Sequence, residues 1–291
     1  MSFRPNLLNN QANTCTGPYQ ELFIYYIKGR LKIDGKPLPD DCLGNWEEEE
    51  DSFLFFSRPA PEEIKTILSR QPQLSYIDSY HMPYEQWLGE VFSTFEHGKF
   101  RVIPPWEASP NSINGNRTLS ILLDPGLVFG TGTHPTTRDC LDALELAAGS
   151  AAFKTVLDLG TGTGLLALAA AKLGSSGVVA VDLNLLAAKT AHRNVRLNHL
   201  QNRIVSVQGR AENMIAYPAD LVIANIHYDV MRRLVSHRSF LTKKRFILSG
   251  LLRSEARNIA DILARHRVKI IKQWTHEGIW YTFYGETEQN I

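Results

Sequence analysis

The stretch "VLDLGTGTGLLALAAA", Val156–Ala171, decides the fold of this chain. It opens with an apolar run typical of a buried strand and closes with strong helix formers. Between them stand Gly160, Gly162 and Gly164, and only glycine takes positive φ at so tight a turn while letting the backbone approach a ligand. The helix that follows offers unpaired N–H groups at its start. The stretch therefore predicts a ligand-binding strand–turn–helix junction.

Strands and helices alternate along the chain around this junction. The expected strands lie at 154–160, 177–184, 203–209, 219–225, 244–250, 268–274 and 278–285, with helical patterns between most of them. Strands separated by helices of this length predict a doubly wound, mostly parallel, seven-stranded Rossmann-like α/β domain. Only a turn separates the last two strands, so one of them should run antiparallel. The ligand of such a sheet lies beyond the carboxyl ends of its strands.

The first hundred residues predict a small α+β domain instead. Runs rich in aromatic and branched residues favour strands, prolines and glutamates start a helix over 59–71, and an apolar stripe predicts another helix over 84–95. The acidic run Glu47–Asp51 is typical of a solvated loop. A polar segment rich in Ser, Asn, Gly and Pro then marks a boundary. We expect a substrate-recognition domain over 1–105, a linker over 106–117 and the larger domain over 118–291.

Composition restricts the partners. The 291 residues include 31 basic and 30 acidic side chains, and a net charge of +1 disfavours nucleic acid as the main partner. Cys15, Cys42 and Cys140 have neither disulfide-framework nor zinc-ligand spacing, so we expect no metal. No apolar run approaches the roughly 20 residues that span a bilayer. These features predict a reduced, cytoplasmic protein without a membrane partner.

Two cofactors compete for the glycine loop. Residues 162–167 fit a dinucleotide fingerprint, and Asp182 lies 20 residues beyond Gly162, where an acid would bind ribose hydroxyls in either case. Asp158 precedes the glycines, where it would repel a pyrophosphate and face a cationic amino-acid group. The fourth strand ends in Asn225, with no hydride-transfer acid or base beside it. We therefore favour S-adenosylmethionine over NAD.

A second stretch, "LDPGLVFGTGTHPTT" (Leu123–Thr137), has the composition of a loop but leads into a helix. Placed before the glycine loop, it would form the second wall of one cofactor crevice. We expect its threonines, Thr131 among them, to offer hydroxyl and backbone groups to the methionine end of the cofactor. Phe129 would cover the bound cofactor.

Four segments in this order, "LDPGLVFGTGTHPTT", "VLDLGTGTG", "AVDLN" and "ADLVIANI", resemble the PrmA family of methyltransferases. Members of that family trimethylate the eleventh protein of the large ribosomal subunit. The resemblance is strong over 118–252 and implies S-adenosylmethionine as cofactor and a ribosomal protein as partner. Carried over position by position, it implies cofactor contacts at Thr137, Gly160, Asp182 and Asn225.

The chain departs from the family pattern in two places. The family usually continues with Ile-Leu after the asparagine, whereas here Ile226 is followed by His227 and Tyr228, which would line the acceptor entrance. The family's N-terminal domain, which grips the ribosomal protein, has a helix between its first two strands. Here residues 29–51 fill that interval without helical periodicity. The second departure bears on the acceptor more than on the chemistry.

The sequence thus predicts an S-adenosylmethionine-dependent protein N-methyltransferase in which Asn225 orients the acceptor amine. Two alternatives stay open: a methyltransferase of the same fold acting on lysines of another protein or on a small molecule, and a catalytically silent S-adenosylmethionine-binding module. Nucleic-acid methylation is disfavoured, because the Asn-Pro-Pro-aromatic signature of adenine amino-group methylation is missing from "NIHY" (Asn225–Tyr228).

Overall fold

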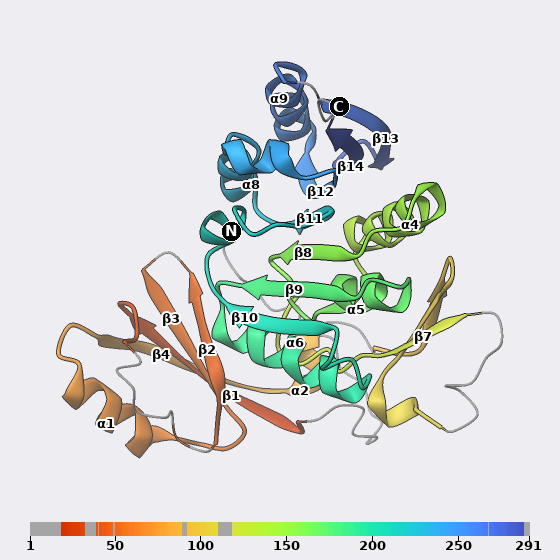
Figure 1. Cartoon of the computed structure of the whole chain (residues 1–291). Coiled ribbons are helices and arrows are strands. Elements are labelled where there is room, and N and C mark those ends of the chain that lie inside the picture. Colours follow the sequence, from red (N-terminus) through yellow and green to blue (C-terminus); the bar gives the residue numbers. More distant parts are fainter. Residues whose placement is uncertain are drawn as a thin grey trace.

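A computed structural model describes residues 19–32, 39, 41–48, 50–88, 92–109, 118–266 and 268–287 (Figure 1). Cys15 and most of the predicted linker lie outside these residues. Three β-sheets carry the fold. The largest is built from the alternating half of the chain, and the two smaller ones come mainly from the first 122 residues.

The largest sheet has seven strands, as predicted. Their spatial order is β10 (Ile204–Gln208), β9 (Gly177–Asp182), β8 (Thr155–Leu159), β11 (Leu221–Asn225), β12 (Arg245–Leu252), β14 (Trp280–Thr287) and β13 (Val268–His276). The first five are parallel, and β14 is antiparallel to both of its neighbours. This confirms the mostly parallel sheet and the reversed strand near the C-terminus.

Helices cover both faces of this sheet. One apolar cluster joins it to α4 (Pro135–Ser150), α5 (Leu165–Lys172) and α6 (Leu185–Leu197). The other joins it to α7 (Ala211–Met214), α8 (Tyr228–Val235), the 3-10 turn η2 (Arg238–Thr242) and α9 (Arg253–Ala264). Alternate residues of one strand enter opposite clusters: Leu221 and Ile223 enter the first, Val222 and Ala224 the second. The doubly wound architecture follows from strands that are apolar on both faces.

The N-terminal sheet has the order β2 (Cys42–Glu48), β3 (Asp51–Phe56), β1 (Glu21–Lys28) and β4 (Ser75–Pro83), and all its pairs are antiparallel. Helix α1 (Pro61–Arg70) packs on one face through Ile64. This confirms the small α+β unit. The expectation of a solvated loop at Glu47–Asp51 was wrong, because Glu47 and Glu48 end β2 and Asp51 begins β3.

The third sheet contains β5 (Phe95–His97), β6 (Phe100–Ile103) and β7 (Leu119–Leu122), with helix α2 (Tyr84–Leu88) before it and the 3-10 turn η1 (Pro105–Glu107) after β6. Its parallel β6–β7 pair crosses the boundary expected at 106–117. Phe100 and Val102 also enter the core of the larger domain. We therefore propose that the N-terminal domain ends near α2.

The N-terminal sheet docks on the larger domain through an apolar cluster of its own. Leu22, Ile24 and Phe55 contribute one side, and residues 127–128 and 186–187 contribute the other. Figure 1 shows this sheet beside α6 and the β10 edge of the large sheet. Among the described residues, no helix is both long and apolar enough to cross a membrane.

Candidate functional site

The glycine loop, residues 160–164, sits at the carboxyl end of the central strand β8. Gly160, Gly162 and Gly164 all have positive φ, at 75°, 55° and 86°. The backbone N–H groups of Gly160 and Thr161 donate to the carbonyl of Val181 at 2.8 and 2.9 Å. The loop is therefore tied to β9 as well as to the start of α5, and its shape depends on glycine at these positions.

The Gly/Thr loop, residues 123–134, lies directly against the glycine loop. The Thr163 N–H donates to the carbonyl of Phe129 at 3.0 Å, and the Thr163 hydroxyl donates to the carbonyl of Gly130 at 2.5 Å. A Cβ atom at Gly162 would lie 2.3 Å from that Phe129 carbonyl oxygen. The two loops thus form one surface, as the sequence predicts.

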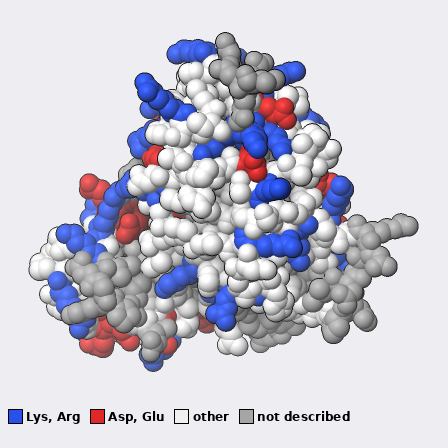
Figure 2. Space-filling model, in the orientation of Figure 1, with Lys and Arg blue, Asp and Glu red and all other residues white. Residues whose placement is uncertain are grey.

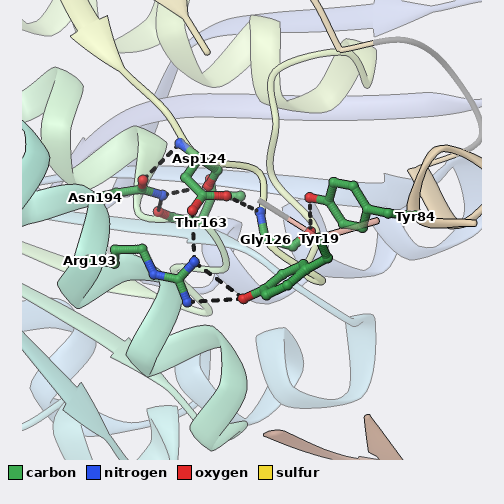
Figure 3. A network of polar contacts seen from close by, with 7 residues as sticks. All are labelled: Tyr19, Tyr84, Asp124, Gly126, Thr163, Arg193 and Asn194. Atoms are coloured by element: carbon green, nitrogen blue, oxygen red, sulfur yellow. Dashed lines mark hydrogen bonds and ion pairs between the residues drawn. The ribbon is translucent and has the colours of Figure 1, made fainter. Parts of the chain in front are cut away.

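A buried asparagine of α6 holds these two loops together (Figure 3). The Asn194 side chain is fully buried, accepts a hydrogen bond from the Asp124 N–H at 2.8 Å, and donates at 2.8 Å to the carbonyls of Asp124 and Thr163. One turn later, Asn198 makes a similar two-way pair with the backbone of Leu122 at 3.0 and 2.7 Å. Helix α6 is therefore a platform for the Gly/Thr loop.

The same network reaches the N-terminal domain. Arg193 donates to the Asp124 carboxylate at 2.7 Å and to the Tyr19 hydroxyl at 3.3 Å. The Tyr84 hydroxyl, which is buried, donates to the Gly126 carbonyl at 2.6 Å. Figure 3 shows the tyrosines reaching the loop from the side opposite Asn194. The position of the N-terminal domain is thus coupled to the shape of this loop.

Replacing Asn194 by alanine will destabilise the protein by about 3 kcal/mol or more, because three buried backbone groups lose their partners at once. Chemical denaturation measures this loss. His192→Ala, an exposed neighbour on the same helix, is the matched control and should change stability by less than about 0.5 kcal/mol. Equal stabilities for the two variants would contradict the role given to Asn194.

Two carboxyl groups stand at the ends of adjacent strands. Asp182 ends β9, where it accepts from the N–H groups of Gly162 at 3.0 Å and Asn184 at 2.9 Å. Asp158 is 1% exposed beneath the glycine loop, where it accepts from the Thr161 hydroxyl at 2.5 Å. Burial raises the pKa of both groups, and that of Asp158 reaches about 7. The site therefore favours a cationic, hydroxyl-bearing ligand over a pyrophosphate.

Asn225 ends β11, on the other side of β8 from Asp182. Its side-chain nitrogen donates to the hydroxyls of Thr136 at 3.3 Å and Thr137 at 3.5 Å, both buried at the start of α4. No donor among the described residues is hydrogen-bonded to the carboxamide oxygen, so that oxygen can accept a hydrogen bond from a ligand. Gly250, with φ of 81°, lies beside that oxygen, and a Cβ atom there would be 2.9 Å from it.

A hydrogen-bonded network of side chains reaches Asn225 through Thr136. The Ser249 hydroxyl of β12 lies 3.3 Å from the Thr136 carbonyl, to which it can donate, and 2.5 Å from the Thr282 hydroxyl of β14. The Thr282 hydroxyl lies 3.1 Å from the half-buried carboxylate of Asp139. Burial raises the pKa of Asp139. This network of side chains links β11, β12, β14 and α4 at the carboxyl edge of the sheet.

His134 caps the start of α4 next to this network. Its Nδ1 atom lies 2.7 Å from the Thr136 hydroxyl and accepts from the Thr136 N–H at 3.4 Å. The proton of the neutral ring is therefore on Nε2, and partial desolvation lowers the His134 pKa. The Trp280 ring lies edge-on to His134 at 5.0 Å. These two rings form a wall beside Asn225.

The side chains of four other residues predicted for the site form none of the contacts described above. Phe129 is 79% exposed and meets Trp46 of β2 at 5.8 Å, and the Thr131 hydroxyl lies 3.0 Å from that of Thr133. His227 is exposed and caps α8, whereas the Tyr228 hydroxyl donates to Asn258 of α9 at 3.0 Å. In the part of the chain that the structure describes, no group of three or more His, Cys, Asp or Glu could hold a metal.

The sequence predictions missed the residues that hold the site together. Asn194 of α6 and Asn198, which caps the end of that helix, were missed, because the sequence shows neither that Asn194 is buried nor which backbone groups the two side chains meet. His134 lies within the quoted Gly/Thr stretch, but no function was predicted for it, and the contact between Thr136 and Asn225 was not foreseen. Ser249 carried no signal in the sequence, because its partners come from two other elements.

The family model of ribosomal protein L11 methyltransferase (PrmA) matches residues 69–288. A ribosomal protein L11 methyltransferase from Carboxydothermus hydrogenoformans is 31% identical over 281 residues, which cover 92% of this chain and 88% of that protein.

Other relatives match over a shorter region. The corresponding protein of Geobacillus kaustophilus is 37% identical over 183 residues, or 60% of this chain, and the match spans only 57% of that relative. The crystal structure of ribosomal protein L11 methylase from Lactobacillus delbrueckii subsp. bulgaricus superposes with a TM-score of 0.58 and 26% identity, covering 68% of this chain and all of that one. By its sequence over 69–288 and by its sheet, the chain belongs to the PrmA family of ribosomal protein L11 methyltransferases.

Proposed function

We propose that this protein is an S-adenosylmethionine-dependent protein N-methyltransferase whose acceptor is ribosomal protein L11. The match to the family model over 69–288 carries this proposal. The site is compatible with it, because two carboxyl groups and a carboxamide stand at the ends of the neighbouring strands β9, β8 and β11. We place the activity in the cytoplasm.

The proposed cofactor site consists of the strand-end carboxyl groups, the glycine loop and the Gly/Thr loop. Asp182 would bind the ribose hydroxyls, and the glycine loop with Thr137 and Thr131 would hold the methionine end. Asp158 would act from beneath the loop, by holding Thr161 and by its negative potential. Phe129 would cover the site from the side of Trp46. When bound, S-adenosylmethionine supplies an activated methyl group on a sulfonium.

The chain's own residues would align the acceptor. The Asn225 nitrogen is held by Thr136 and Thr137, so its oxygen is free to accept an N–H of the incoming amine and orient its lone pair. A lysine is charged at neutral pH and must lose a proton first. Burial beside a cation lowers an amine pKa, so the site can work without a dedicated base. His134 would not serve as one, because its Nδ1 is engaged.

The pH dependence of cofactor binding tests the place of Asp158. Burial holds its pKa at about 7 in the free protein, and a bound cation would lower that pKa. Below about pH 7, binding must therefore displace a proton, and affinity should fall by up to about tenfold per unit as the pH falls toward about 5. Above about pH 7 the Asp158 carboxylate is already ionised, so the affinity for the cofactor should level off.

Calorimetric titration between about pH 5.5 and about pH 8 measures this profile. Asp158→Asn is the comparison and should flatten it. The free protein should show the opposite trend in stability. Because the folded-state pKa is raised above the ordinary value, stability contributed by protonated Asp158 is lost as the pH rises from about 4 through about 7. An affinity that ignores pH in both proteins would remove Asp158 from the cofactor site.

The acceptor is tested by transfer of a labelled methyl group into a bacterial lysate, with and without ribosomes. We expect one labelled band at L11, dependent on the enzyme. A second candidate is methylation of lysines in another protein. It is favoured by the family model beginning at residue 69, which leaves β1, β2 and β3 outside the match. Label confined to non-ribosomal protein would support that candidate and overturn the first.

A further inference from the structure

A pocket of about 380 Å³ opens at the carboxyl edge of the large sheet, away from the glycine loop. It is lined by Leu252, Arg253, Ser254, Arg257 and Ile279. These residues come from the end of β12, the first turns of α9 and the turn that joins β13 to β14. None of these five residues belongs to the proposed cofactor site.

The pocket lies on the acceptor side of the site. Its lining residue Leu252 pairs with Trp280 across the β12–β14 ladder, and the Trp280 ring meets that of His134 at 5.0 Å. His134 contacts the Thr136 hydroxyl, to which Asn225 donates. A continuous wall of side chains therefore runs from Asn225 to the rim of the pocket.

A second connection comes through α8. Tyr228, three residues beyond Asn225, donates its hydroxyl to Asn258 of α9 at 3.0 Å. Asn258 directly follows Arg257 of the pocket. Tyr228, expected at the acceptor entrance, is thus hydrogen-bonded to the helix that supplies the two arginines. The pocket therefore adjoins this entrance through α9 as well as through Trp280.

The lining combines positive charge with apolar surface. Arg253 and Arg257 are exposed and lie four residues apart on α9, so they project from adjacent turns. Among the described residues, neither forms an ion pair; Arg253 donates only its Nε–H, to the Tyr281 hydroxyl at 3.3 Å. Leu252 and Ile279 are 40% and 48% exposed beside them. Two guanidinium groups that lack an ion pair among the described residues, set between apolar walls, suit a carboxylate with an apolar neighbour.

We propose that this pocket, the Arg253–Arg257 subsite, binds an acidic side chain of the protein acceptor close to the amine that is methylated. The inference rests on the proposed protein methylation and adds a sequence requirement to it. An extended peptide that places its amine at Asn225 would pass His134 and Trp280 before reaching the arginines. The subsite would then fix the register of the acceptor by binding a carboxylate at a set distance from the amine.

The charge distribution favours a peptide over a nucleic acid here. A phosphate backbone is bound by a run of cations, and its affinity grows with each phosphate neutralised. Figure 2 shows Lys and Arg scattered over the visible face with Asp and Glu between them, and no continuous band. On α9 itself, Asp261 follows Arg257 at the same spacing of four. Two arginines with apolar walls match one carboxylate better than a strand of phosphates.

Steady-state kinetics of the full chain with L11 test the subsite. We expect Arg257→Glu to raise KM for the protein acceptor about tenfold, with kcat and cofactor affinity unchanged, because the lost contact binds the acceptor without touching the reacting atoms. The effect should shrink at high ionic strength. Arg265→Glu, at the far end of α9, makes the same charge change as Arg257→Glu and should leave KM unaltered. A KM that does not change in Arg257→Glu would overturn the subsite and leave the proposed function standing.

A binding assay separates the two proposals, because it needs no turnover. The probes are a fluorescent peptide of alternating Glu and Leu, its Gln and Leu counterpart, and a single-stranded oligouridylate. The subsite predicts that the acidic peptide binds the parent protein, that Arg257→Glu weakens this about tenfold, and that the Gln peptide binds neither. This result would hold even if L11 is not the acceptor. Binding of the oligouridylate alone, lost in Arg257→Glu, would overturn the peptide assignment, as would absence of binding by every probe.

Discussion

Replacing Gly162 by alanine will reduce S-adenosylmethionine affinity by at least about a hundredfold. Position 162 has φ of 55°, a conformation that costs an alanine roughly 1–2 kcal/mol, and its new Cβ atom would lie 2.3 Å from the Phe129 carbonyl oxygen. Backbone cannot yield as a flexible side chain does, so the Gly/Thr loop must move away from the glycine loop. Both walls of the proposed crevice would then change together. Calorimetric titration with the cofactor measures the loss.

Gly174→Ala is the matched control for this variant. Gly174 also has positive φ, at 112°, but no atom lies within 4 Å of the position its Cβ would take. The control therefore carries the backbone strain without the collision, and it should lower stability slightly while leaving cofactor affinity intact. If Gly162→Ala and Gly174→Ala bound the cofactor equally well, the contact between the two loops would have no part in the site.

Asn225→Ala will lower kcat by about a hundredfold or more, the usual cost of removing one oriented polar group from a reaction centre. Its oxygen is the group proposed to orient the amine, and Thr136 and Thr137 hold it in place. Cofactor affinity should change far less than kcat, since Asp182 and the glycine loop are untouched. Single-turnover methylation together with calorimetry separates the two quantities. The exposed Asn202→Ala serves as the control.

Near-normal turnover in Asn225→Ala would show that the acceptor amine is aligned by other groups. The Ser249–Thr282–Asp139 chain would then be of structural use only. If turnover and cofactor affinity instead fell in parallel, Asn225 would belong to the cofactor site and not to amine alignment.

The large sheet could be predicted because the alternation of its strands with helices follows from local signals. Central strands such as β8 and β11 are mostly apolar, and a glycine directly follows β8 and β10. The reversed direction of β14 followed from the short connection after β13. Strand β2 was not predicted, because "CLGNWEE" contains a glycine and ends in two glutamates, and its strand conformation depends on pairing with β3. The helix expected over 84–95 is also shorter than its apolar stripe: α2 ends at Leu88, and Phe95 begins β5.

Part of the site could likewise be predicted from the sequence, and part of it could not. The glycine loop and the strand-end positions of Asp182 and Asn225 follow from a contiguous motif and the rule for open α/β sheets. The support from α6 could not be predicted, since Asn194 bonds to the backbone of residues 70 and 31 positions away. The division of the domains was equally hidden, because the pairing of β6 with β7 connects segments on either side of the expected linker. Such contacts join residues far apart in the sequence, so no local pattern of hydrophobic or polar residues predicts them.

The central claim, that this chain methylates ribosomal protein L11, is tested most directly by intact-mass spectrometry of purified L11 after incubation with the enzyme and S-adenosylmethionine. We predict that L11 gains mass in whole methyl groups, that fragmentation places them on amino groups, and that Gly162→Ala and Asn225→Ala abolish or strongly slow the gain. An unchanged L11 mass, with an enzyme that binds the cofactor and labels another protein, would contradict the claim.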